Sequence, residues 1–297
     1  MIVTLMSNYS FNNSRLYLKD SFRFFLLLCA LLTVLQTANA SPWMRSSGES
    51  HIVTMMGQSR ADEFWDKNRR LQRDNCESKD VDAFIRYEYG YSYYHTLFTD
   101  VKWESDQCGG SESKGIPDIK IGLRGRLNPY RNGRTWQASL TIPIQGDIRN
   151  RSEPGHGQFG LNVGMYFQFK PDPYLNPAEL GQRGYWSWAL GTKLFTGGVA
   201  HKAWTNLKWS DSLFNTSFDY GIKLNAEYSF GGDDNSDSFS GGENKRVEDY
   251  DVITGTLSFS HKLSKKVRGR VSLSQDFAGR NTIKSTALKF GLSKTWK

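Results

Sequence analysis

The sequence predicts an all-β protein, an antiparallel transmembrane β-barrel of about 12 strands, and three observations lead to this fold class. An export signal opens the chain. Apolar and polar residues then alternate repeatedly, with the two-residue period of a strand. No segment after residue 40 approaches the roughly 18 consecutive apolar residues of a membrane helix. The mean hydropathy of the chain is low, at −0.56, and aromatic residues make up 14% of it. The hydropathy of a barrel strand averages to a low value because apolar lipid-facing residues alternate with polar lumen-facing ones.

The first element is a secretory signal peptide at residues 1–40. Arg15, Lys19 and Arg23 form a basic region, residues 24–35 are an uncharged apolar run, and residues 38–40 read Ala-Asn-Ala before Ser41. This order of basic, apolar and small residues is that of a cleavable export signal. An uncleaved anchor is the alternative, but the apolar run is short for a span. Residues 41–297 then form the outer-membrane β-barrel.

Twelve strand-like runs follow the signal. In the run 116–127, Ile119, Ile121 and Leu123 share one face, and charged residues share the other. The run 216–230 alternates in the same way over a greater length. The runs lie near residues 50–58, 81–89, 94–104, 116–127, 135–146, 158–169, 184–196, 202–210, 216–230, 250–261, 266–276 and 284–296. Gly57 and the polar residues after it predict an early end to the first run.

The connections predict the orientation of the barrel. With both termini in the periplasm, the outer loops are 59–80, 105–115, 147–157, 197–201, 231–249 and 277–283. Several of these are long and polar, whereas inward turns such as 90–93 and 264–265 are short, as is usual in outer-membrane barrels. The segments 128–134 and 170–183 also face the periplasm in this topology, and the second is long and proline-rich.

A soluble β-sandwich of similar length is the alternative fold. The runs are longer than the five or six residues usual in a sandwich. Aromatic residues also gather near strand ends, as in the girdles at the two membrane interfaces. The predicted girdle residues are Tyr87, Tyr89, Trp103, Trp186, Trp209, Tyr228, Phe230 and Trp296.

Four short motifs resemble a proteobacterial outer-membrane family named for its link to meta-pathway phenol degradation. Residues 87–91 with Leu97 resemble its first hairpin, 115–122 its G-x-x-D strand opening, 142–147 its apolar-Pro-x-x-Gly-Asp strand exit, and 155–158 its glycine-rich return. The resemblance covers residues 43–198. It implies an outer-membrane barrel that passes small, often aromatic, compounds. Gln145 stands where the family usually carries threonine, and Lys297 follows an aromatic Trp296 that resembles the barrel assembly signal.

The polar faces of the strands predict the lining of the lumen. The basic residues assigned to it are Arg86, Lys102, Lys120, Arg124, Arg126, Lys193, Lys202, Lys208, Lys223, Arg268, Arg270 and Lys289. The acidic residues are Asp82, Glu88, Asp100, Glu104, Asp118, Asp219 and Glu227. The excess of bases favours a narrow channel for anionic or polar solutes, and the family resemblance implies aromatic ones. A salt-bridged interior that only fills a structural, envelope-associated barrel is the alternative, because twelve strands lie between filled and open barrels.

A lipid hydrolase of the outer membrane is a more remote alternative. Such barrels hold a Ser–His pair, and none of His51, His95, His156, His201 and His261 begins a His-x-Ser-Asn stretch. We therefore expect no enzyme activity. The histidines and cysteines also lack the spacing of metal ligands, so no metal or other cofactor is expected.

Two cysteines, Cys76 and Cys108, remain after removal of the signal. Both predicted loops that carry them emerge on the same side, and the exported chain meets an oxidising compartment, so we predict a disulfide between them. The expected partners are outer-membrane lipid and lipopolysaccharide, the barrel assembly machinery and a small solute. Without the signal the chain holds 35 lysines and arginines against 29 acids, a net charge of +6. This modest excess does not argue for nucleic acid, and export argues against it.

Overall fold

The computed structural model describes residues 44–108, 111–127, 134–144, 157–169, 184–197, 200–212, 217–231 and 250–297, without the side chains of residues 74–76, 108, 111 and 112. Its strands are β1 (Ser50–Trp65), β2 (Leu71–Gly90), β3 (His95–Cys108), β4 (Ser111–Gly115), β5 (Asp118–Arg126), β6 (Arg134–Pro143), β7 (Gly160–Phe169), β8 (Tyr185–Phe195), β9 (His201–Ser212), β10 (Phe218–Phe230), β11 (Asp251–Ser264), β12 (Val267–Arg280) and β13 (Thr282–Trp296). No helix among the described residues is long and apolar enough to cross a bilayer.

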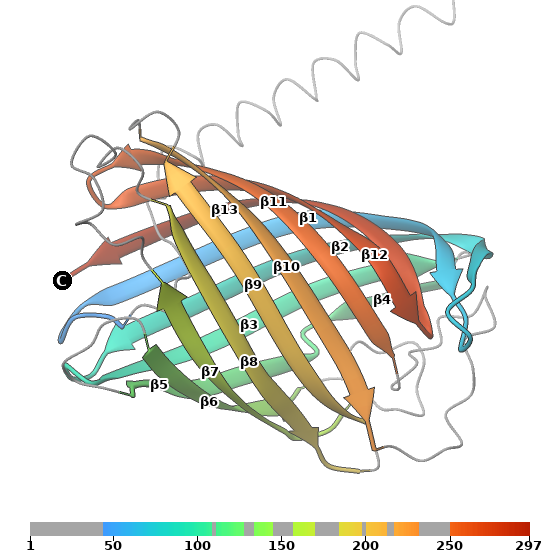
Figure 1. Ribbon diagram of the computed structural model, residues 1–297, viewed down its shortest axis with the longest axis horizontal. Helices are drawn as coiled ribbons and strands as arrows, with labels where there is room; N and C mark the ends of the chain where they lie inside the picture. Colours follow the sequence, from blue (N-terminus) through green and yellow to red (C-terminus); the bar gives the residue numbers. More distant parts are fainter. Residues whose placement is uncertain are drawn as a thin grey trace, which may run out of the picture.

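The strands close into one antiparallel barrel (Figure 1). β1 pairs with β2 on one side and with β13 on the other, so Ser50 lies opposite Trp296. The short β4 and the longer β5 both pair with β3 and follow one another along it. Pro117 separates them and has no N–H for the ladder. The two therefore count as one interrupted strand, and the predicted number of twelve is confirmed for the described residues.

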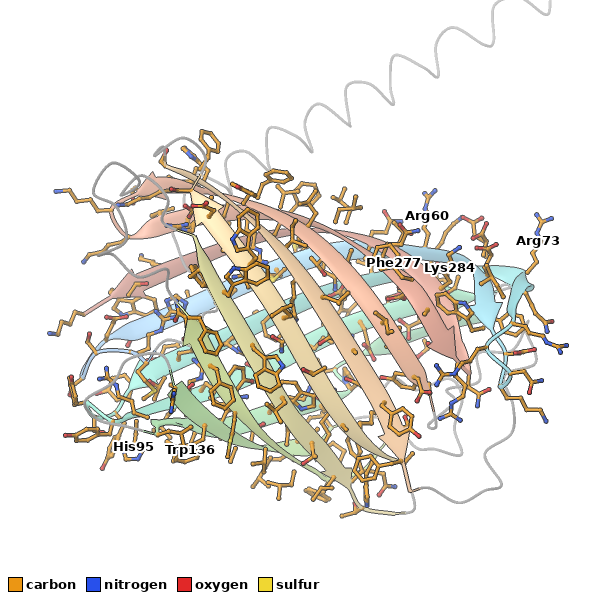
Figure 2. All side chains as sticks on the ribbon, viewed as in Figure 1. Arg60, Arg73, His95, Trp136, Phe277 and Lys284 are labelled. Atoms are coloured by element: carbon orange, nitrogen blue, oxygen red, sulfur yellow. The ribbon has the colours of Figure 1, made fainter. Side chains whose placement is uncertain are left out.

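The barrel has two distinct ends. We call the end at which β1 begins and β13 finishes the terminal end, and the opposite one the far end. Figure 2 shows His95 and Trp136 at the terminal end, and Arg60 and Arg73 towards the far end. The predicted segments 128–134, 147–157, 170–183 and 231–249, and the signal peptide, lie wholly or mostly outside the described residues.

The outer surface of the barrel is apolar. On β10, Ile222 and Leu224 point outward and are about half exposed, and Leu140 on β6 and Phe290 on β13 are exposed to a similar extent. A continuous apolar surface of this kind is unusual for a protein in water and is what lipid requires of a barrel exterior. The exterior therefore fits a bilayer.

Aromatic residues flank this apolar band near both ends. At the terminal end the ring of Tyr87 lies 6.4 Å from that of Trp296, and Trp186 lies 6.3 Å from Trp209. Phe230, in the last position of β10, contacts His201 at the far end, with ring centroids 5.8 Å apart. The two groups occupy the levels expected of interfacial girdles.

The hairpins at the far end are longer than the sequence predicted. The proposed loop 59–80 is wrong, because β1 continues to Trp65 and β2 begins at Leu71. The same correction applies to 105–115, which is mostly β3 and β4, and to 277–283, where β12 continues to Arg280. These extensions carry no regular apolar alternation and are held by ladder hydrogen bonds, and on β1 Ala61, Phe64 and Trp65 are buried.

Gly57 does not end the first strand. It faces the lumen, and a Cβ there would lie 2.5 Å from Cγ of Lys289 and 3.1 Å from a carboxylate oxygen of Asp82. The glycine gives room to that ion pair rather than stopping the strand. The turn between β1 and β2 is held by Asp66, which accepts hydrogen bonds of 2.8 Å from the backbone N–H groups of Asn68 and Arg70. These bonds, that from Arg70 first, lower the pKa of Asp66.

Candidate functional site

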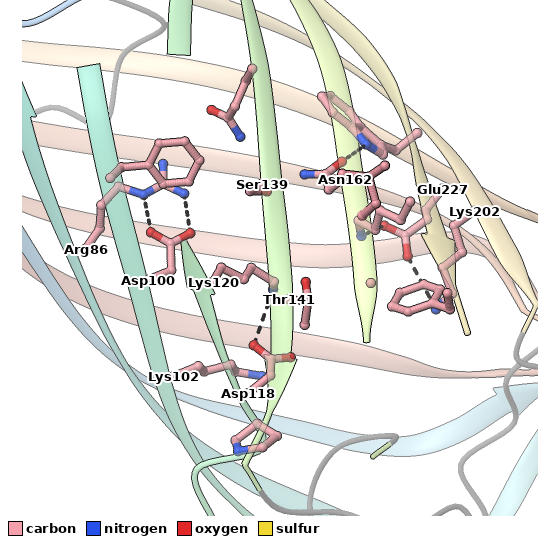
Figure 3. Close-up of a pocket in the computed structure, with 18 of the residues that line it drawn as sticks. Arg86, Asp100, Lys102, Asp118, Lys120, Ser139, Thr141, Asn162, Lys202 and Glu227 are labelled. Atoms are coloured by element: carbon pink, nitrogen blue, oxygen red, sulfur yellow. Dashed lines mark hydrogen bonds and ion pairs between the residues drawn. The ribbon is translucent and has the colours of Figure 1, made fainter. Parts of the chain in front are cut away.

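The lumen contains a cavity of about 530 Å³. Its walls come from β2, β3 and β5 to β10, together with Tyr250 just before β11, so it is enclosed by most of the barrel (Figure 3). Five basic and four acidic side chains line it: Arg86, Lys102, Lys120, Lys193, Lys202, Asp100, Glu104, Asp118 and Glu227. The site is thus a charged, water-accessible space inside an apolar shell.

The bases of the cavity are paired with its acids. Arg86 donates two hydrogen bonds of 2.6 Å to Asp100, in the bidentate geometry of a strong ion pair. On the opposite wall Glu227 accepts from Lys193 at 2.6 Å and lies 3.6 Å from Lys202. Two further pairs join neighbouring inward positions of one strand, namely Lys102 with Glu104, and Lys120 with Asp118 at 3.7 Å. This pairing leaves the cavity itself with little net charge.

Aromatic side chains also enter the lumen. Trp204 donates a 2.9 Å hydrogen bond to Asn162, and Tyr250 donates one of 2.9 Å to Glu227. The ammonium of Lys202 lies 3.6 Å from the ring centroid of Tyr250, a cation–π contact. The cavity can therefore offer a solute both charged groups and ring faces.

The sequence reasoning assigned aromatic residues to the lipid face and missed these. Phe98 and Trp204 occupy the inward parity of their strands, and neighbouring glycines make room for them. A Cβ at Gly122 would lie 2.3 Å from the ring of Phe98, and one at Gly164 would lie 2.6 Å from the ring of Trp204. A glycine beside an aromatic residue of polar-face parity was the available signal.

A buried ionic network lies nearer the terminal end. The side chain of Glu88 is 0% exposed and contacts Arg45 at 2.7 Å and Arg124 at 3.4 Å. Arg124 also donates hydrogen bonds of 3.1 and 3.3 Å to Gln137. Arg45 precedes β1, so the segment before the first strand docks against the inside of the barrel and narrows the lumen there.

The structure brings the other residues assigned to the lumen to three further places. Asp82 pairs with Lys289 at 2.7 Å across β2, β1 and β13. Arg126 lies over the ring of Tyr93 at 4.3 Å, at the terminal end. The remaining five, which do not line the cavity, lie on the inner face of β9, β10 and β12: Lys208, Asp219, Lys223, Arg268 and Arg270.

The predicted disulfide cannot be judged from contacts, because the side chains of Cys76 and Cys108 lie outside the described residues. Their backbones belong to β2 and β3, which are neighbours. The last β2–β3 pair is Lys79 with Gln107, so Cys108 follows this pair on β3 and Cys76 lies three residues before it on β2, at the same end of the barrel. Both cysteines therefore belong to extended strands rather than to loops, and the bridge stays a prediction.

Two Ser–His hydrogen bonds occur in the described part of the chain. Ser92 lies 3.2 Å from His95, and Ser217 lies 3.2 Å from His261. No hydrogen bond between either histidine and a carboxylate is found there, so these contacts alone do not make a catalytic triad. The described residues also contain no group of three or more histidine, cysteine, aspartate or glutamate residues that could hold a metal ion.

The fold is that of a known class of membrane protein. The crystal structure of an outer membrane channel from Pseudomonas putida F1 is similar to 88% of this chain and to 100% of its own, with a TM-score of 0.67 at 12% identity. This likeness confirms the predicted outer-membrane barrel fold.

Other solved barrels are more distant. The NanC porin has a TM-score of 0.47 at 6% identity, over 82% of this chain and 98% of its own. The transport unit of the autotransporter AIDA-I from Escherichia coli has 0.46 at 8%, over 89% and 96%. Both are too dissimilar to add to the argument. No protein-family model matches the chain, and no curated protein does.

Proposed function

We propose that the chain is a channel of the bacterial outer membrane that passes small polar solutes through its lumen. The observation that carries the proposal is the inversion of polarity: an apolar exterior surrounds a cavity of about 530 Å³ that is lined by paired charged side chains. A barrel that served only as a rigid anchor would not require such a space. Known small-molecule sites occupy roughly 300–1,000 Å³, so the cavity suits a solute of sugar or aromatic-acid size.

The chemistry of the lining favours solutes that carry both polar groups and a flat apolar face. Ion pairs such as Arg86 with Asp100 offer hydrogen-bond donors and acceptors side by side. The rings of Trp204 and Tyr250 offer stacking surfaces. An aromatic or sugar ring with charged or hydroxyl substituents meets both kinds of contact.

The orientation is part of the same proposal. Both ends of the described chain meet at the terminal end, and the long polar segment 232–249 connects β10 to β11 at the far end. Short periplasmic turns and longer outer loops are the usual arrangement. The terminal end accordingly faces the periplasm and the far end faces outward, toward the lipopolysaccharide.

A non-conducting, envelope-associated barrel is the second candidate, and one observation favours it. Arg45, Glu88 and Arg124 form a buried network near the terminal end, with Glu88 wholly inaccessible. For the barrel to conduct, solutes must pass beside this network.

Swelling of liposomes that contain the refolded mature protein separates the two candidates. In an isotonic solution of a small solute such as arabinose or benzoate, a channel admits the solute and the liposomes swell. Liposomes with heat-denatured protein serve as the control. Swelling no faster than this control, with every solute of this size, would reject the channel in favour of the non-conducting barrel.

A further inference from the structure

A second group of basic side chains lies in the lumen, away from the cavity. It consists of Lys208 on β9, Lys223 on β10, and Arg268 and Arg270 on β12, and we call it the basic wall. Lys208 and Lys223 are direct partners in the β9–β10 register, so their inward side chains start about 5 Å apart. All four side chains are half-buried and therefore reach the water of the lumen.

Carboxylates compensate little of this charge. Within the described part of the chain, Asp219 pairs with Arg268, and Lys208 donates a hydrogen bond to the neutral phenol of Tyr185 at 3.3 Å. No ion pair or hydrogen bond of the side chains of Lys223 and Arg270 is found there. Three cations, Arg270, Lys208 and Lys193, lie near enough to Lys223 to repel it. The excess of bases counted along the sequence is thus concentrated here, since the cavity bases are paired.

Small hydroxyl side chains lie beside these cations in the strand register. Thr256 and Ser258 on β11 face the lumen beside Lys223 and Gly221, and their partners on β12 are Ser274 and Ser272. Ser260 then lies opposite Arg270. Ser258 is buried and donates to the carbonyl oxygen of Gly221, and Ser260 accepts a hydrogen bond from Arg268. These short, neutral side chains put no carboxylate beside the basic wall.

Like charges held this close repel one another unless water or a counter-anion screens them. A neutral polar solute can accept hydrogen bonds from these groups but does not relieve the repulsion, whereas an anionic group does both. We propose that the basic wall is a binding site for the carboxylate, sulfate or phosphate group of a solute. The inference rests on the proposed channel for its role in transport. Lys193 lines the cavity and is also near enough to Lys223 to repel it, so the basic wall adjoins the cavity.

The first test is ion selectivity in planar bilayers. Under a tenfold KCl gradient the wild type is expected to prefer chloride, and Lys223→Gln with Arg270→Gln is expected to lower the chloride-to-potassium permeability ratio by about threefold or more. Lys294→Gln removes one positive charge from the exposed outer face and is expected to leave the ratio unchanged. Arg270→Lys keeps the charge and should retain most of the preference. Heat-modifiable mobility on gels verifies that each variant is folded.

The second test measures binding without conduction. Sodium sulfate, compared with sodium chloride at equal ionic strength, should raise the unfolding temperature of the wild type more than that of the Lys223→Gln, Arg270→Gln variant. Any general salting effect of sulfate is common to both proteins. If the wild type carries no current but this difference in unfolding temperature persists, the proposed channel function is rejected and the proposed anion site on the basic wall is retained. The proposed anion site would be rejected if the double variant forms open channels with an unchanged permeability ratio and its unfolding temperature responds to sulfate as that of the wild type does.

Discussion

Replacing Glu88 by glutamine tests the energetic weight of the network near the terminal end. The Glu88 carboxylate is 0% exposed and contacts Arg45 at 2.7 Å and Arg124 at 3.4 Å, while the Arg124 side chain is 3% exposed. The change keeps the volume and an acceptor oxygen but leaves buried guanidinium groups without their carboxylate. Breaking a buried ion pair from one side costs about 3–5 kcal/mol, and we expect about 3 kcal/mol here because the glutamine oxygen still accepts a hydrogen bond.

The matched control is Glu77→Gln. Glu77 pairs with Lys79 at 3.5 Å, but the two side chains are 52% and 43% exposed, so the loss should be about 0–1 kcal/mol. Urea titrations of both variants in vesicles, followed by tryptophan fluorescence, give the free energies of unfolding. Adding Arg124→Met to Glu88→Gln removes the stranded cation and should restore part of the stability. Equal small losses for Glu88→Gln and Glu77→Gln would refute the reasoning, because they would mean that the network is hydrated.

Three further predictions concern packing, covalent structure and orientation. Gly122→Ala should lower the free energy of unfolding by about 1–3 kcal/mol, because its Cβ would meet Phe98 at 2.3 Å and the carbonyl oxygen of Ala138 at 2.7 Å. Gly269→Ala, with contacts of 3.4 Å or more, should cost little, and equal urea midpoints would contradict this. Mass spectrometry of the unreduced mature protein should find Cys76 joined to Cys108, and two alkylated thiols would disprove the bridge. In a Cys76→Ser, Cys108→Ser background, an impermeant maleimide on intact cells should label Asn68→Cys at the far end but not Lys265→Cys at the terminal end, and the reverse pattern would overturn the topology.

The strand pattern was predictable because the side-chain period of a strand is fixed at two. Within the lipid this period alone decides which residues point inward, so Arg86 and Asp100 were assigned to the lumen, and the structure puts them there, in contact. The far-end hairpins were not predictable in this way. Residues 59–65 have no apolar face, and backbone pairing, which leaves little trace in the sequence, extends β1 through them.

The arrangement of charges in the site was beyond the sequence as well. A count of inward residues gives an excess of bases but not its location. Arg86 and Asp100 lie on neighbouring strands, whereas Lys193 and Glu227 lie on β8 and β10 with β9 between them. Their contact depends on the stagger of the barrel, which is set by all strands together. The basic wall can be recognised only when the structure shows which of the inward basic residues are paired with acids.

Single-channel recording with a chemically modified lumen tests the channel most directly. Asn225 lines the cavity, and Leu224 beside it faces the lipid. In the cysteine-free background, a charged methanethiosulfonate reagent should reduce the conductance of Asn225→Cys channels in discrete steps. Leu224→Cys channels should conduct as before. A wild type without open-channel current, or Asn225→Cys channels that are modified without any change in conductance, would contradict a solute path through this lumen.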